Sequence, residues 1–145
     1  MKKIILMVTM MLTFVFTSCQ TREHEIINFD KLPSKAQSFI KDNFGDFIIL
    51  QIEKDFELFG SEYTVYFKEG SKIEFDRKGE WSEIEVKTGI PSKIILESIL
   101  NYINENHPDN FIIEISKDKK DYEVELNNSL DLVFDLKGKF LRYDD

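Results

Sequence analysis

Side chains suited to covalent or acid–base catalysis are few in this chain, which has two histidines and one cysteine among 145 residues. His24 lies in a polar, charged stretch, and His107 precedes Pro108 at the end of an expected helix, where a cation suits the helix dipole. Neither histidine belongs to a recognisable Ser/His/Asp grouping, and the motifs G-x-S-x-G and H-E-x-x-H are missing. The sequence therefore predicts that the protein is not an enzyme and uses no cofactor.

Carboxylates are more numerous, with 27 Asp and Glu residues, and oxygen ligands of this kind suit Ca²⁺. The acids that could converge are Asp118, Asp121, Asp144 and Asp145. However, the chain has no loop of the EF-hand type, and lysines crowd the first pair. Scattered acids are typical of the solvated side of a sheet, so we assign no metal site. Binding of calcium or a small ligand stays as an alternative function.

The only cysteine, Cys19, stands where an export signal would be cut. Two lysines precede an apolar run over residues 4–16, which is too short for a comfortable permanent membrane span. The residues before the cysteine, Phe-Thr-Ser, resemble a bacterial lipobox, although Phe16 stands where Leu is usual. In such a signal the cysteine is lipidated and becomes the new N-terminus.

The lipobox resemblance divides the N-terminal region into two parts. Residues 1–18 are expected to be a lipoprotein signal peptide, and residues 19–30 the lipidated cysteine and a tether. The lack of Asp at position 20 implies an outer-membrane destination, facing either the periplasm or the cell exterior. An ordinary secreted protein and an uncleaved membrane segment are the alternatives. Because the cysteine lies at the anchor, the folded part has no disulfide and depends on its core.

The formal charge of −8 limits the class of partner. A strongly acidic protein is a poor candidate for binding nucleic acid or anionic headgroups through charge. We therefore expect no nucleic acid partner and membrane attachment only through the N-terminal lipid.

The elements that position the polar side chains are organised around a segment that occurs twice. Residues 73–81 and 132–140 share alternating apolar positions, then Phe-Asp, two residues, Gly, one residue and an aromatic. Asp can cap a tight turn through its carboxylate, and Gly supplies a positive φ, so each segment predicts a β-hairpin. Each follows an apolar stripe with helical spacing, and we expect similar units over residues 31–88 and 89–145.

The predicted fold class is α+β: two tandem repeats of one helix followed by a four-stranded antiparallel meander. The second helix is expected to be the longer one. Both helices would cover one face of the sheet or sheets, leaving a mostly charged open face. Whether the two sheets join edge to edge or pack as neighbouring lobes stays open at this stage.

Four side chains are candidates for contact with a partner: Trp81, Tyr66, Thr64 and Glu83. Strict alternation places Trp81 beside Glu83 at the edge of the open face, where with Tyr66 it would form an aromatic anchor. In the alternative, which we favour, a bulge at Gly79 shifts the register and turns Trp81 into the core, as for Phe140 in the second hairpin.

The helix-and-four-strand unit, its duplication, the Phe-Asp-x-x-Gly-x-aromatic hairpin and the signal with cysteine together resemble one family. They are similar to the PepSY-like envelope proteins related in fold to the secreted beta-lactamase inhibitor protein, over about residues 31–145. The resemblance implies an exported, non-enzymatic protein whose sheet surface grips a partner. The inhibitor's own activity is not implied, because its binding loops have no match here and its disulfides are absent.

These observations together predict a lipid-anchored envelope protein that binds another protein, such as an envelope enzyme that it inhibits or assists.

Overall fold

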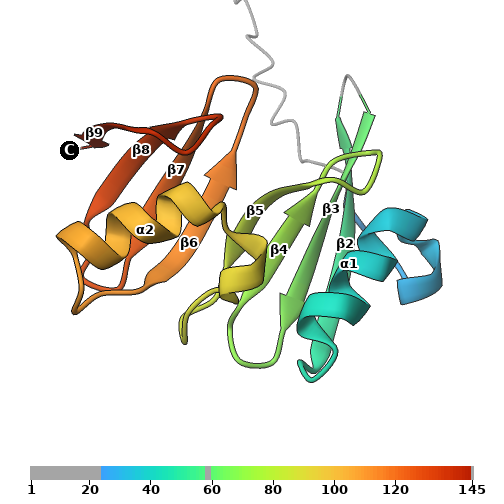
Figure 1. The fold of residues 1–145 in the computed structure, drawn as a ribbon. Coiled ribbons are helices and arrows are strands. Elements are labelled where there is room, and N and C mark those ends of the chain that lie inside the picture. Colours follow the sequence, from blue (N-terminus) through green and yellow to red (C-terminus); the bar gives the residue numbers. More distant parts are fainter. Residues whose placement is uncertain (1–23, 58–59, 145) are drawn as a thin grey trace, which may run out of the picture.

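The computed structural model describes residues 24–57 and 60–144. It consists of one nine-stranded antiparallel sheet and two short helices, with the strands ordered in the sheet as in the chain (Figure 1). The strands are β1 (His24–Ile26), β2 (Ile49–Glu57), β3 (Gly60–Phe67), β4 (Lys72–Phe75), β5 (Trp81–Glu85), β6 (Ile112–Lys117), β7 (Asp121–Leu126), β8 (Asp131–Asp135) and β9 (Phe140–Asp144). The helices are α1 (Ser34–Phe44) and α2 (Glu97–Asn106), and a 3₁₀ turn precedes each, over Phe29–Lys31 and Ser92–Ile94.

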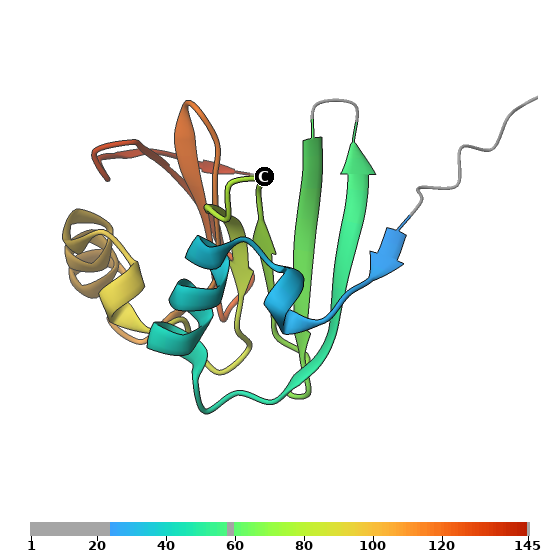
Figure 2. The same cartoon turned by 90° about the vertical axis from the view of Figure 1, so that its right-hand side faces the viewer.

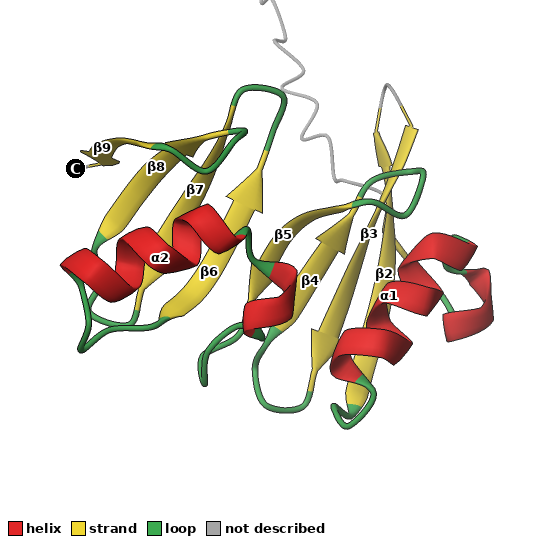
Figure 3. Ribbon diagram, in the orientation of Figure 1, coloured by secondary structure: helices red, strands yellow, loops and turns green. Residues whose placement is uncertain are grey.

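The predicted fold class is wrong. Separate helix-plus-meander units would leave β5 and β6 as edge strands with unpaired backbone groups, which sheets tend to pair or cover. Instead β5 pairs with β6 through Glu83–Ser116, Ile84–Ile115 and Glu85–Glu114, which makes the sheet continuous (Figure 3). The protein is therefore mostly β. The division into units at residue 88 stays a prediction.

Two further expectations about elements are also corrected. Residues 24–26, predicted as part of a tether, form β1, which pairs with β2 from His24–Asp55 to Ile26–Glu53. The second helix is not the longer one: α1 has 11 residues and α2 has 10. The reason is that Ile95 has an extended backbone (φ −88°, ψ 142°), so the helix begins only after Leu96.

The core lies between the helices and one face of the sheet. In α1 the buried residues Ala36, Ile40 and Phe44 recur every four positions and so form one stripe along the helix. Phe44 stacks on Phe67 of β3 with 5.8 Å between ring centroids. In α2, Tyr102 meets Phe134 of β8 edge to face at 5.4 Å. Both helices lie on the same side of the sheet, so its other face is open (Figure 2).

Within the described residues, no helix combines the length and hydropathy required to cross a bilayer. Cys19 and the predicted signal peptide lie outside the described residues.

Candidate functional site

The open face of the sheet carries two rows of side chains that cross from β2 to β9. Residues paired in register point to the same side of a sheet, so each row is continuous. The first row is Glu53, Thr64, Glu74, Glu83, Ser116, Glu123, Val133 and Arg142. The second row is Gln51, Tyr66, Lys72, Glu85, Glu114, Glu125, Asp131 and Asp144. Nine carboxylates face two basic side chains in these rows, so the open face is strongly acidic.

Lys72 neutralises the centre of the first half of this face. Its Nζ lies 3.0 Å from Glu74 Oε1 and 2.6 Å from Glu83 Oε1. Burial alone would lower the pKa of Lys72, but hydrogen bonds to Glu83 and Glu74 outweigh it and raise that pKa. Beside it, the Tyr66 hydroxyl lies 3.4 Å from Glu53 Oε2, and burial and that carboxylate raise the pKa of Tyr66. In this half, Glu53, Glu74 and Glu83 each have a polar or charged partner.

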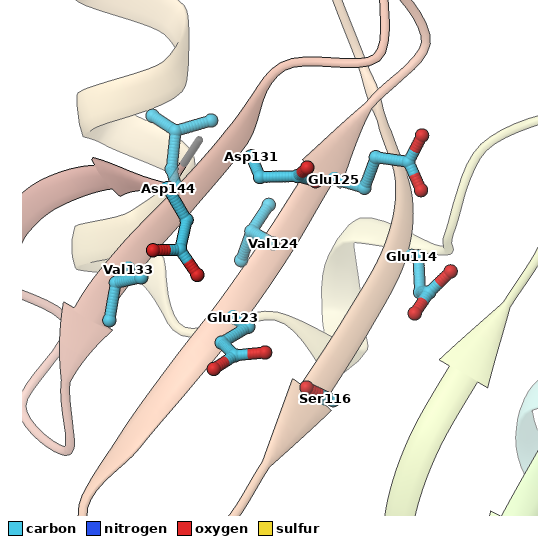
Figure 4. Close-up of a pocket in the computed structure, with 9 residues that line it drawn as sticks. Glu114, Ser116, Glu123, Val124, Glu125, Asp131, Val133 and Asp144 are labelled. Carbon is cyan, nitrogen blue, oxygen red and sulfur yellow. The ribbon is translucent and has the colours of Figure 1, made fainter.

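The second half contains a hollow of about 300 Å³, which we call the acidic hollow. Its floor includes Val133, which is fully buried although it lies on the open face. The carboxylates that line the hollow are Glu114, Glu123, Glu125, Asp131 and Asp144 (Figure 4). Among the described residues, no three of these acids converge closely enough to hold a metal ion. The hollow is an acidic surface without a preformed ligand set.

Burial and neighbouring carboxylates act together on Glu114. Burial first, and then the charges of Glu83, Glu85 and Glu125, raise the pKa of the Glu114 carboxyl to about 7. The neighbours come from β5 and β7, on either side of β6, so the effect depends on the β5–β6 pairing. A cation placed here would relieve this repulsion.

The structure brings three of the four predicted contact residues together. Thr64, Tyr66 and Glu83 lie on the open face, although Thr64 is only 8% exposed. Trp81 does not join them, because it pairs with Phe75 while Glu83 pairs with Glu74. The extra residue between these pairs is Ser82, so a bulge turns Trp81 to the helix side, where it packs against the core. Trp81 thus lies on the helix side, as in the favoured interpretation, but it is only partly buried, and the bulge is at Ser82 rather than Gly79.

Sequence reasoning did not single out Glu114. The alternation of Glu83 and Glu85 in β5 and of Glu123 and Glu125 in β7 placed acids on one face of each strand. Only the β5–β6 pairing places β6 between the acidic strands β5 and β7, and that pairing joins residues that are far apart in the sequence.

The two histidines lie on separate elements. His24 is in β1, and His107 caps the C-terminus of α2, with its Nε2 3.4 Å from the Tyr143 hydroxyl. Of the acids considered for calcium, Asp118 and Asp121 lie in one turn, where the Asp118 carboxylate accepts the backbone N–H of Asp121. Asp144 lies on another strand, opposite Asp131, and Asp145 lies outside the described residues.

The family model described as beta-lactamase-inhibitor-like, PepSY-like, matches residues 61–142. The chain belongs to this PepSY-like family. The match begins in β3 and ends in β9, so it contains most of both rows of the open face. Among curated proteins, no sequence matches this chain.

Crystal structures of bacterial proteins resemble the whole fold of this PepSY-like protein. A candidate calcium-regulated periplasmic protein from Bacteroides thetaiotaomicron has 37% identity and a TM-score of 0.81, with 84% of this chain and 97% of that chain covered. A candidate periplasmic protein of the DUF2874 family from Bacteroides vulgatus has 34% identity and a TM-score of 0.81, with 85% and 98% covered. A second Bacteroides vulgatus protein, of unknown function, has 32% identity and a TM-score of 0.80, with 85% and 100% covered.

These relatives are described as periplasmic, which supports the predicted export to the cell envelope. The family is inhibitor-like, and nothing in these comparisons indicates catalysis.

Proposed function

We propose that this PepSY-like protein is a non-enzymatic envelope protein that binds a protein partner through the open face of its sheet. The observation that carries the proposal is the pair of rows with nine carboxylates and two basic side chains. A face this acidic is complementary to a basic surface, and complementary charge speeds encounter and excludes acidic partners. The partner would therefore present a basic patch, as an envelope enzyme that is inhibited or assisted could.

The test uses two charge-reversal variants in a crosslinking capture from envelope extract. Glu123→Lys with Asp131→Lys changes two exposed acids of the open face. Glu97→Lys with Glu105→Lys changes two exposed acids of α2 and is the matched control, since it alters the net charge equally. One dominant protein should be captured by the unchanged protein and the control, and lost with the open-face variant. Equal capture by both variants would contradict the proposal.

We also propose that the protein is anchored by a lipid on Cys19, with an outer-membrane location. The lipobox-like sequence supports this, and several acyl chains at about 0.8 kcal/mol per buried CH₂ would hold the domain firmly. Cys19→Ala should release the protein from membranes and remove the acyl mass from its N-terminal peptide. Unchanged membrane association would contradict the anchor without affecting the binding proposal.

Calcium binding in the acidic hollow is the second candidate function. It is favoured by the crowded carboxylates around Glu114, and a relative with 37% identity is described as calcium-regulated. Calcium should raise the melting temperature of the unchanged protein, while Asp131→Asn with Glu125→Gln should remove the rise. Magnesium at the same ionic strength is the control. An equal response to both ions, or none, would argue against this function.

The pH dependence of stability tests the electrostatics behind both candidates. The pKa of Glu114 is raised from 4.5 to about 7 in the folded state. The folded protein therefore holds a proton that the unfolded chain has released, and stability should fall as pH rises through this window. Glu114→Gln should remove this fall and raise the melting temperature at pH 8. If the melting temperatures of the variant and the parent depend on pH in the same way, the pKa of Glu114 is not raised in solution.

A further inference from the structure

Trp81 lines a depression on the helix side of the sheet, away from the acidic rows. Two turns form its walls: the β4–β5 turn and the β6–β7 turn, both at the upper end of the sheet in Figure 1. The depression has a volume of about 480 Å³ and is lined by Asp76, residues 80–82 and residues 117–120. We call it the Trp81 notch. Its volume falls in the range of binding sites for small groups, about 300–1,000 Å³.

The notch combines an aromatic surface with a cation. Lys117 Nζ lies 4.0 Å from the centroid of the Trp81 ring, in cation–π contact. Tyr122 follows at 6.4 Å between ring centroids. Burial lowers the pKa of the Lys117 ammonium group, although Glu80 opposes the shift. A partly buried ammonium group in contact with a ring gains from an anion placed beside it.

The acids that line the notch are already committed to other partners. Asp76 Oδ1 accepts hydrogen bonds from the backbone N–H groups of Lys78 and Glu80, at 2.8 and 2.9 Å. Asp118 Oδ1 accepts the N–H groups of Lys120 and Asp121, and these bonds hold the pKa of Asp118 below its ordinary value. Glu80 forms an ion pair with Lys35.

The lysines are not committed in the same way. Within the part of the chain that the structure describes, no ion pair engages Lys117, Lys119 or Lys120. What is left to receive a ligand is therefore the pair of ammonium groups on Lys119 and Lys120 and the part of the indole that Lys117 does not cover. The notch has three lysines beside three acids, whereas carboxylates predominate on the open face.

We infer that the Trp81 notch binds an acidic segment of a protein in which a carboxylate stands next to an aromatic or apolar side chain. The apolar group would lie against the part of Trp81 that Lys117 leaves uncovered, and the carboxylate would pair with Lys119 and Lys120, which also line the notch. The inference does not rest on the proposed open-face function, because the two surfaces lie on opposite sides of the sheet.

The experiment uses the fact that Trp81 is the only tryptophan, so its fluorescence reports directly on the notch. The purified protein is titrated with three blocked tripeptides: Asp-Phe-Asp, its neutral counterpart Asn-Phe-Asn, and Asp-Ala-Asp without the ring. A saturable change is expected with the first, with dissociation constants at least about tenfold weaker for the other two, since tenfold corresponds to about 1.4 kcal/mol. Equal responses to the three peptides, or no saturation at concentrations on the order of millimolar, would overturn the inference.

Two variants keep this test specific. Lys119→Gln with Lys120→Gln should weaken binding of the acidic peptide about tenfold, whereas Lys137→Gln with Lys139→Gln, on the other Phe-Asp hairpin, should leave it unchanged. The open-face variant Glu123→Lys with Asp131→Lys should also bind the peptide normally. Equal weakening in both lysine variants, together with tighter binding by the open-face variant, would mean that net charge, not the notch, attracts the peptide, and would overturn the inference.

Collisional quenching provides a second readout that needs no peptide. If the notch is locally positive, iodide should quench Trp81 more strongly than caesium, despite the net charge of −8. Lys119→Gln with Lys120→Gln should reverse the order. Stronger quenching by caesium in the unchanged protein would contradict the positive notch.

Discussion

The two Phe-Asp hairpins of this protein have the same turn but different surroundings. In each turn one aspartate oxygen accepts two backbone N–H groups: Asp76 at 2.8 and 2.9 Å, and Asp135 at 2.9 and 2.9 Å. The glycines, Gly79 and Gly138, have φ values of 79° and 77°. Local sequence therefore determines the turn in both places.

The aromatic residue after each turn has a different role because different groups lie across from it. Phe140 stacks on Tyr102 of α2 at 4.5 Å and meets Phe134 at 5.8 Å. Among the described residues, no ring of α1 meets Trp81, which instead meets Tyr122 and the Lys117 ammonium group. The same hairpin thus completes the core in one place and leaves a partly open aromatic surface in the other.

The largest expected effect tests the contact of each turn with its helix. A Cβ on Gly79 would lie 2.8 Å from the backbone nitrogen of Ala36, which cannot move aside. Gly79→Ala should lower the free energy of unfolding by about 3 kcal/mol, combining a left-handed backbone with overpacking. Gly138→Ala meets mainly Ser98 Oγ, a side-chain atom, and should cost about 2 kcal/mol.

A double variant sharpens that comparison. Ser98→Ala removes the atom in the way, so Gly138→Ala should cost less in that background in urea unfolding. The serine also donates a hydrogen bond to the Lys137 carbonyl at 2.9 Å, so Ser98→Ala alone is the required reference. If Gly138→Ala proves more costly than Gly79→Ala, the two turns do not differ through the atoms that an added methyl group would meet.

The next effect compares the two aromatic residues. Full burial of Phe or Trp makes truncation to Ala cost about 3–5 kcal/mol, and both rings here are partly buried. Phe140→Ala should lower the free energy of unfolding by about 2–3 kcal/mol, because it leaves Tyr102 and Phe134 without their partner. Trp81→Ala should cost about 1–2 kcal/mol. Equal costs in chemical denaturation would assign Trp81 a purely structural role.

The smallest effect concerns the charge of the turn aspartate. Hydrogen bonds from Lys139 and Lys137 hold the pKa of Asp135 below its ordinary value. A depressed folded-state pKa stabilises the protein above the unfolded value, near 4, and this contribution is lost as pH falls through the folded value. Asp135→Asn should therefore have a slightly lower melting temperature than the parent at pH 6, and this difference should disappear towards pH 2. A difference that does not change with pH would show that the carboxylate charge does not contribute to stability.

The hairpins were predictable because their determinants are local. Asp76 with Gly79, and Asp135 with Gly138, specify their turns within a few residues, and the apolar stripe of α1 specifies its buried face in the same way. The open face followed from alternation, and Thr64, Tyr66 and Glu83 lie on it as expected.

What could not be predicted depends on pairing between distant segments. The strand β1 has three exposed residues and exists because β2 offers it an edge. The position of Glu114 between two acidic strands, and of Lys117 over Trp81, requires the β5–β6 pairing, which sequence left open. The Ser82 bulge decided the side on which Trp81 lies, and strict alternation gives no sign of it.

The β5–β6 pairing also has a consequence for how the molecule opens. It has three register pairs, compared with eight between β2 and β3, and one of the three sets Glu85 opposite Glu114. Two backbone hydrogen bonds, from Val86 to Ile113 and from Ile90 to Ile112, extend the contact. Partial unfolding follows the weakest boundaries of a structure. The amides of β5 and β6 should thus exchange with solvent deuterium before those of β3, and a molecule that opens there would be poised to exchange halves with a neighbour.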